Sequence, residues 1–376
     1  MRLADNTIYL DCNATTPMTR PVSDVYARAA AEFFGNPSSP YGAGRKAREG
    51  LELGRAQVAS LVGCDSSEVV FTGSATEANY QAMLSAAMAR PERDRILLSA
   101  IEHPSIYDQQ PRFRELGFKV EEIPVDQKGV VDMDALAKTA DDRVCLIAVM
   151  TAHNETGVIQ PVKQAADIAR GVGALFLTDA VQAMGKIPSP WPEARPDYLS
   201  IAAHKIYGPK GIAALICREG VPVTPLLVGG GQEGGRRAST QSAALAAAFG
   251  EACRQAGDGA GRFAALAAMR DDFEDGFLSS RHAVIYGRES KRLPNTSFFS
   301  LPGVSGEEVV RALDFRGIAV GTGSACHSGS SGAPRVLRYM GEALSPDTTP
   351  IRISLGIDTT TQDMAEFSRA LEEALK

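Results

Sequence analysis

The chain has 376 residues, which exceeds one average domain, so we expect one large and one smaller domain. Of these residues 44% are hydrophobic and 22% charged, a composition typical of a globular protein. Its formal net charge of -6 argues against nucleic acid as a direct ligand, and no apolar run is long enough to span a membrane. The six cysteines are scattered without a Cys-x-x-Cys pair, which argues against a structural metal site or a disulfide framework and fits a reducing cytoplasm.

The first part of the chain contains a pattern that favours phosphate binding. A short apolar strand at 8–10 runs into a polar turn containing Asn13, and the β-branched and aromatic run 69–72 predicts a buried strand. A small polar turn and the start of a helix follow at 73–79. Free N–H groups and the helix dipole favour an anion at such a helix N-terminus, so this turn is a candidate phosphate site.

Three further strands are predicted in the first half of the chain, and each runs into polar residues. The strands span 96–99, 144–150 and 174–178, and the polar residues that follow them include His103, Asn154 and Asp179. Helix-length segments such as 161–171 separate the strands. This alternation implies βαβ units in an α/β fold with a largely parallel sheet, whose carboxyl edge is where such sheets bind ligands.

The stretch 198–211 sets Lys205, directly after His204, between two predicted strands. Burial at such a position lowers the pKa of a lysine and makes its amine a nucleophile toward carbonyl groups. Asp179 ends the preceding strand, and Gln182 follows it. A lysine that forms a Schiff base and an acidic partner for the pyridinium nitrogen are what a pyridoxal phosphate site needs.

The second half of the chain predicts a smaller domain. A Gly-rich stretch at 229–240 ends at Thr240. A strand and a helix are expected at 294–298 and 309–313. Gly and Ser do not build a core, and they surround Cys326 at 321–332, so an exposed loop is expected there. Arg352 lies on a strand between apolar neighbours, and its planar guanidinium suits a carboxylate.

The sequence Ser-Ile-Ala-Ala-His-Lys-Ile-Tyr-Gly-Pro-Lys-Gly around Lys205 resembles the cofactor-lysine motif of the cysteine desulfurases and selenocysteine lyases, class V of the fold-type-I pyridoxal phosphate enzymes. Other motifs resemble this family in the same order from about Tyr9 to about Thr360, among them those at 35–39 and 351–356. The resemblance implies a large cofactor-binding domain with a mainly parallel sheet and a smaller α+β domain that carries the catalytic cysteine loop. Their expected bounds are 15–257 for the large domain, and 1–14 together with 258–376 for the small one.

The resemblance also implies roles for the candidate residues. Lys205 forms the Schiff base with pyridoxal 5'-phosphate and moves the α-proton, Asp179 faces the pyridinium nitrogen, and His103 stacks on the ring. The other implied cofactor contacts are Ala75, Thr76, Asn154, Gln182, His204 and Thr240, and the implied substrate contacts are Asn13, Asn154 and Arg352. In the family the threonine at position 240 reaches the phosphate of the partner subunit, which implies a homodimer with shared sites.

The activity that the resemblance implies is the release of sulfur from L-cysteine, which leaves L-alanine. Cys326 is then the catalytic nucleophile that carries a persulfide to an acceptor protein, such as a scaffold for iron–sulfur assembly or a carrier for tRNA thiolation. A selenocysteine lyase, with the same fold and cofactor, is one alternative. A sulfur carrier or scaffold without catalysis is another, although the presence of Lys205, Asp179, His103 and Arg352 argues against it.

A few positions depart from the residues that are usual in the family. Tyr41 stands where His is usual, His153 where Asn is usual, Ala202 where Ser is frequent, Ser239 where Gly is usual, and His327 where Thr is more frequent.

Overall fold

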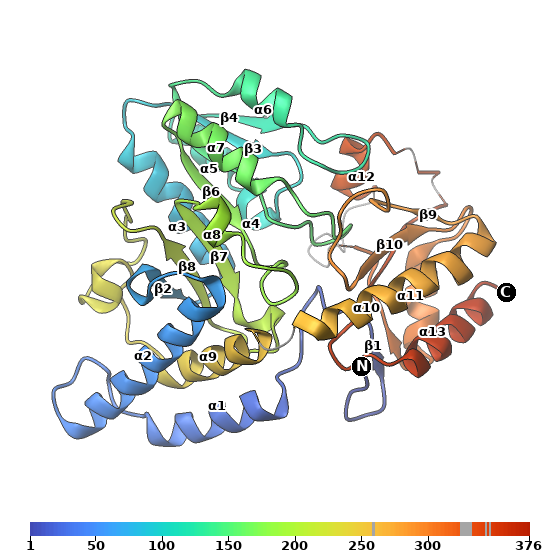
Figure 1. Cartoon of the computed structure of the whole chain (residues 1–376), viewed down its shortest axis with the longest axis horizontal. Coiled ribbons are helices and arrows are strands. Elements are labelled where there is room, and N and C mark those ends of the chain that lie inside the picture. The colour runs from blue at the N-terminus through green and yellow to red at the C-terminus, as the bar shows by residue number, and fades with distance from the viewer. Residues whose placement is uncertain (258–259, 324–332, 343, 346) are drawn as a thin grey trace.

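The computed structural model describes residues 1–257, 260–323, 333–342, 344–345 and 347–376 (Figure 1). Seven strands of these ranges form the main sheet, in the order β2-β8-β7-β6-β5-β3-β4. The strands are β2 (Val69–Thr72), β3 (Arg95–Ser99), β4 (Lys119–Ile123), β5 (Val144–Ala148), β6 (Leu175–Asp179), β7 (Tyr198–Ala202) and β8 (Ala213–Cys217). Pairs from β7 to β4 are parallel, whereas β8 runs antiparallel to both of its neighbours. The expectation of a largely parallel sheet in an α/β fold is therefore confirmed.

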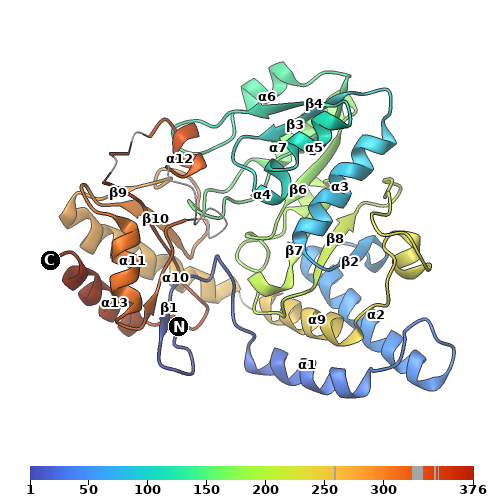
Figure 2. The ribbon, with the colours of Figure 1, turned by 180° about the vertical axis from the view of Figure 1, so that it is seen from behind.

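Helices cover both faces of the main sheet. The helices α1 (Arg20–Glu32), α2 (Gly42–Val62) and α9 (Ala243–Gly257) pack on one face, and α3 (Ala75–Ala89) packs on the other (Figures 1 and 2). Along β7, Leu199 and Ile201 belong to the core of the first face, and Tyr198 belongs to the core of the second. This alternation follows from the period of two in a strand, and it makes three layers. The remaining helices of this part are α4 (Pro104–Tyr107), α5 (Gln110–Glu115), α6 (Met133–Thr139), α7 (Val162–Val172) and α8 (Trp191–Ala194).

The C-terminal part of the chain builds a separate small sheet and its own core. Three strands of its described residues pair antiparallel in the order β12-β10-β9, namely β9 (Val284–Ile285), β10 (Thr296–Ser300) and β12 (Ile351–Ser354). The helices here are α10 (Ala260–Phe273), α11 (Gly306–Asp314), α12 (Arg335–Tyr339) and α13 (Thr361–Ala374). The first strand of the chain, β1 (Ile8–Tyr9), lies among these elements (Figures 1 and 2) and pairs with β11 (Ile318–Ala319).

The segment that follows β1 joins the two parts of the molecule. The N–H of Cys12 donates to the carbonyl of Ser354 at 3.1 Å, and four residues later the N–H of Thr16 donates to the carbonyl of His204 at 2.9 Å. These two bonds hold Asn13 between the small sheet and the end of β7. Within the described ranges, no helix is long and apolar enough to cross a membrane.

Candidate active site

A cavity of about 280 Å³ lies at the carboxyl edge of the main sheet. It is bordered by residues that directly follow β3, β5, β6 and β7, and by the segment after β1. The structure thereby brings together the predicted site residues Asn13, Ala75, Thr76, His103, Asn154, Asp179, Gln182, His204, Lys205 and Arg352. Thr240 lines a different cavity, and Cys326 lies outside the described residues.

Lys205 lies in a short turn of 3₁₀ helix, η2 (Ala203–Lys205), that begins where β7 ends. Its Nζ donates to the carbonyl oxygens of Asn13 at 2.5 Å and of Ala14 at 2.8 Å. The strand places the lysine at the edge of the sheet, and the segment after β1 provides the acceptors. These two backbone oxygens hold the amine at the cavity wall.

Asp179 is the last residue of β6, and its side chain is buried at the cavity wall. One carboxylate oxygen accepts from the side-chain amide of Asn79 on α3, and the other accepts from the N–H of Val181, each at 2.9 Å. The same amide of Asn79 donates to the hydroxyl of Ser105 at 2.9 Å. Because both carboxylate oxygens are held, the orientation of Asp179 is fixed before any ligand arrives.

His103 borders the cavity beside Asp179 and carries no charge near neutral pH. Burial lowers the pKa of its ring, and the nearby carboxylate of Asp179 offsets this only in part. Its Nδ1 accepts from the N–H of Ser105 at 3.1 Å. The preceding residue, Glu102, is buried, and burial raises the pKa of its carboxyl to about 7 despite hydrogen bonds from Ser99 Oγ and the N–H of Met150.

The N-terminus of α3 forms the wall that carries Ala75 and Thr76. The helix begins here because the side chain of Ser74 accepts from the N–H of Glu77 at 3.1 Å, as an N-cap. The first N–H groups of a helix have no carbonyl ahead of them, and the helix dipole is positive at this end. This wall of the cavity therefore suits an anionic group such as a phosphate.

Arg352 on β12 enters the cavity from the small sheet with its side chain only 2% exposed. It donates from one terminal nitrogen to Asp11 at 2.6 Å and from the other to the carbonyl of Asn154 at 3.1 Å. Its Nε is buried, and within the described residues it has no hydrogen-bond partner. A buried charged donor without a partner is costly, so this nitrogen marks a place where an anionic ligand is expected.

His153 shapes the turn that presents Asn154. Its Nδ1 accepts from the N–H groups of Glu155 at 3.3 Å and of Thr156 at 3.2 Å. Burial lowers the pKa of His153 to about 3, so the ring stays neutral and Nδ1 remains an acceptor. A histidine nitrogen thus closes a turn here that a short amide side chain commonly closes. His204, at the opposite side of the cavity, is also kept neutral, since burial lowers its pKa to about 4.

Thr240 lies in the Gly-rich stretch, exposed beside a cavity of about 190 Å³. The stretch is anchored by Glu233, whose buried carboxylate pairs with Arg55 at 2.7 and 2.8 Å and accepts from the N–H of Phe71 at 2.9 Å. Ser239 adopts a φ of 113°, a conformation that favours glycine, which is the usual residue of the family at this position.

The family model "Aminotransferase class-V" matches residues 8–367. The chain belongs to the class-V aminotransferase family. It is 38% identical to a cysteine desulfurase of Sinorhizobium fredii over 98% of this chain and 96% of that protein. It is 36% identical to the cysteine desulfurase NifS of Azotobacter vinelandii over 96% of this chain and 91% of that protein. A solved structure of a NifS-like protein superposes with a TM-score of 0.91 at 33% identity, over 98% of this chain and 99% of that one.

Three polar residues of this class-V aminotransferase site were not expected from the sequence. Asn79 orients Asp179, Asp11 pairs with Arg352, and Lys186 donates to the side chains of Asn13 and Gln182. Asn79 is one of three polar residues, with Gln81 and Ser85, among the buried residues of α3. Asp179, Arg352 and Asn13 are distant in sequence from the residues that contact them, so no local pattern indicates these contacts.

Proposed function

We propose that this chain is a pyridoxal phosphate-dependent cysteine desulfurase, which converts L-cysteine to L-alanine and transfers the sulfur to an acceptor protein. The observation that carries the proposal is that Lys205, Asp179 and Arg352 border one cavity, and that Nε of Arg352 has no hydrogen-bond partner within the described residues. They do so in a chain whose curated relatives named cysteine desulfurase match it over nearly its whole length.

The residues of the cavity fit the cofactor by their chemistry. Lys205 supplies an amine for the aldehyde, and Asp179 supplies an oriented carboxylate for the pyridinium nitrogen. The N-terminus of α3 suits the phosphate. The remaining contacts that we assign to the cofactor are His103, Asn154, Gln182 and His204, together with Ala75 and Thr76 on α3. When bound, pyridoxal phosphate supplies an electron sink for negative charge that develops at the substrate Cα.

We assign the binding of the substrate carboxylate to Arg352. Each terminal nitrogen of Arg352 makes one hydrogen bond and keeps a second N–H, whereas Nε has no partner within the described residues. The Nε–H and the neighbouring terminal N–H offer a planar pair of donors, which matches the two oxygens of a carboxylate. Asn154 and Asn13 border the same side of the cavity. Lys205, which borders the same cavity, takes the proton from Cα, because an amine released from its carbonyl acceptors is a base of suitable strength.

The sulfur step needs a thiolate, for which we propose Cys326. The thiolate attacks the substrate sulfur, an S–S bond forms as the Cβ–S bond breaks, and the carbon skeleton gains a proton to become alanine. One cysteine and one protein thiol thus become one alanine and one persulfide, so no external oxidant is consumed. The persulfide sulfur then passes to a thiol of the acceptor protein, such as a scaffold for iron–sulfur assembly.

We further propose a homodimer in which Thr240 completes the phosphate site of the partner subunit. Its exposed position, away from the cavity of its own chain, supports this assignment. We assign residues 15–257 to the domain that binds the cofactor, and residues 1–14 with 258–376 to the domain that carries Arg352 and Cys326.

A product assay tests the proposed function. The purified protein with pyridoxal phosphate and a thiol reductant is given cysteine or selenocysteine, and alanine, sulfide and selenide are measured. We expect one alanine per sulfide from cysteine. Turnover of selenocysteine with negligible turnover of cysteine would instead identify a selenocysteine lyase, and no alanine from either amino acid would refute the proposal.

A further inference from the structure

Lys186 is a buried cation on the far side of Asn13 from the active-site cavity. Its Nζ donates to Asn13 Oδ1 at 3.0 Å and to Gln182 Oε1 at 2.8 Å. Gln182 in turn donates from Nε2 to the carbonyl oxygen of Asn13 at 2.9 Å. That same carbonyl accepts from the amine of Lys205 at 2.5 Å. The two lysine amines are therefore linked through the backbone and the side chain of one asparagine.

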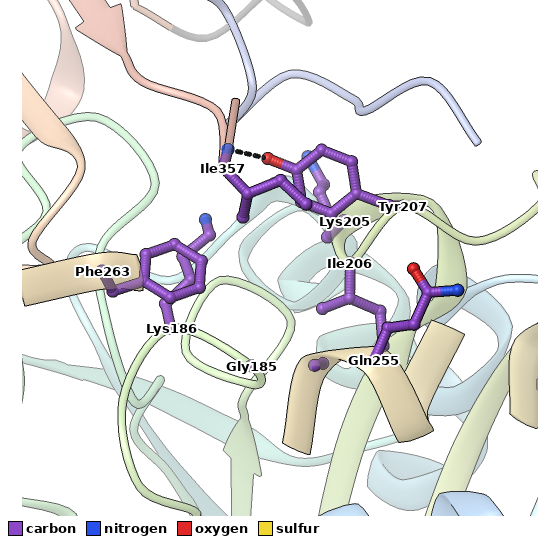
Figure 3. Close-up of a pocket in the computed structure, with 9 residues that line it drawn as sticks. Gly185, Lys186, Lys205, Ile206, Tyr207, Gln255, Phe263 and Ile357 are labelled. Atoms are coloured by element: carbon purple, nitrogen blue, oxygen red, sulfur yellow. Dashed lines mark hydrogen bonds between the residues drawn. The ribbon is translucent and has the colours of Figure 1, made fainter. Parts of the chain in front are cut away.

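A second, small cavity lies between these two lysines and the C-terminal part of the chain. Its volume is about 30 Å³, which is enough for one or two water molecules. Figure 3 shows Lys186 and Lys205 at this cavity, with Phe263 on α10 and Ile357 after β12 facing them. Its lining is largely apolar, so the charge of Lys186 is poorly solvated and depends on its two amide acceptors.

We propose that Lys186 is a positioning residue for Lys205, holding Asn13 and Gln182 so that the Asn13 carbonyl meets the Lys205 amine at the cavity wall. This inference rests on the proposed function, in which the amine of Lys205 reacts. Without Lys186, Gln182 Oε1 loses the ammonium that it accepts from, and among the described residues Asn13 Oδ1 keeps a single bond, from the amide of Asn295 at 3.3 Å. The backbone oxygens that hold Lys205 then lose their support.

The same arrangement has an electrostatic consequence. Two ammonium groups that share one asparagine repel each other, so the pair gives up one proton more readily than a single lysine does. Burial, reinforced by the charge of Lys205, lowers the pKa of Lys186 to about 7. The other groups that face Lys186 do not neutralise it: burial raises the pKa of the Cys12 thiol to about 11, and Arg352 adds positive charge.

The described titratable groups that line the active-site cavity with Lys205 are His103, His204, Asp179 and Arg352. His103 and His204 both lose their protons readily, because burial lowers the pKa of each ring. Asp179 is the carboxylate at this cavity, and its oxygens are held by Asn79 and Val181. Below about pH 7, where Lys186 carries its charge, repulsion between the two lysines therefore favours an unprotonated amine at Lys205, which is the form that attacks a carbonyl.

The capture of pyridoxal phosphate by the apoprotein tests this inference without any turnover. The rate at which the lysine-bound absorption band appears is measured from about pH 6 to about pH 10, a range that spans perturbed and ordinary lysines. For Lys186→Met we expect about tenfold slower capture at about pH 6, where Lys186 of the wild-type protein carries its charge, and little change above about pH 8, where it does not. Lys186→Gln, also uncharged, is the reserve variant and is read in the same way if Lys186→Met does not fold.

Two comparisons separate this role from simple stabilisation. Lys210→Met removes a charge from an exposed lysine near the same turn, and it should leave the capture rate at about pH 6 unchanged. Lys186→Arg, which keeps the charge, should capture the cofactor at about pH 6 at close to the wild-type rate. A lowered Tm with a wild-type capture rate at about pH 6 in the uncharged variants would overturn the inference. Failure of the wild-type protein to capture the cofactor would instead count against the proposed function.

Discussion

Replacement of Arg352 by alanine should weaken cysteine binding strongly while leaving much of the chemistry intact. Arg352 lines the cavity and its Nε has no partner within the described residues, so we expect the variant to lose two charge-assisted hydrogen bonds to the substrate carboxylate. At about 1.5 kcal/mol each, this loss is about 3 kcal/mol, or roughly a 100-fold increase in KM. The effect falls on KM because the carboxylate is held equally in the ground state and the transition state.

The same variant should be modestly less stable. Asp11 loses its partner, but its side chain is 18% exposed and water relieves part of the cost, so we expect a loss of about 1–2 kcal/mol. Arg292→Ala is the matched control, since Arg292 is a buried arginine paired at 2.9 and 2.8 Å with Glu274 on the C-terminal part. It should lower Tm without raising KM. An unchanged KM in a folded Arg352→Ala protein would show that the carboxylate is bound elsewhere.

Three further predictions test the dimer, the neutral histidine and the sulfur carrier. If Thr240 acts in the partner's site, mixed dimers of Thr240→Ala and Lys205→Ala chains regain one complete site, so the mixture should exceed the summed activities of the separate variants. Burial lowers the pKa of His153 from 6.5 to about 3. Below about pH 6.5, His153 therefore binds a proton in the unfolded chain but not in the folded chain. The resulting stability is present above that pH and falls by about 2 kcal/mol by about pH 5, and His153→Asn should flatten the unfolding free energy over this range. Cys326→Ala should end sulfide release from cysteine and spare more of any selenide release from selenocysteine, because selenolate is the better leaving group; alkylation after turnover should find the persulfide on Cys326 of the wild-type protein.

Local patterns were sufficient to predict most strands of the main sheet, though not β4, and the edge of the sheet that carries the site. The run 69–72 is β2 itself, because consecutive β-branched and aromatic residues suit a strand buried on both faces. The segment 161–171 is α7 (Val162–Val172), one residue later than expected. Lys205 and Asp179 could be placed at neighbouring strand ends because parallel strands finish at one edge, and β6 and β7 are indeed paired.

Contacts between distant segments could not be predicted in this way. Asn79 and Asp179 are 100 residues apart, and Asn13 and Lys186 are 173 residues apart, so only the folded chain shows that they meet. The pairing of β1 with β11 is equally non-local, and it is what carries Asn13 to Lys205. The roles of the site residues and of Cys326, the domain bounds and the dimer stay predictions.

The most direct test of the central claim is to find which lysine carries the cofactor. The purified holoprotein is reduced with borohydride, digested, and the peptide that bears the pyridoxyl group is sequenced by mass spectrometry. We predict that the modification lies on Lys205, within the peptide around Ile201 to Lys210, and that Lys205→Ala protein shows neither the modification nor turnover. A modification on Lys186 or Lys210, or full turnover of cysteine by Lys205→Ala, would contradict the account.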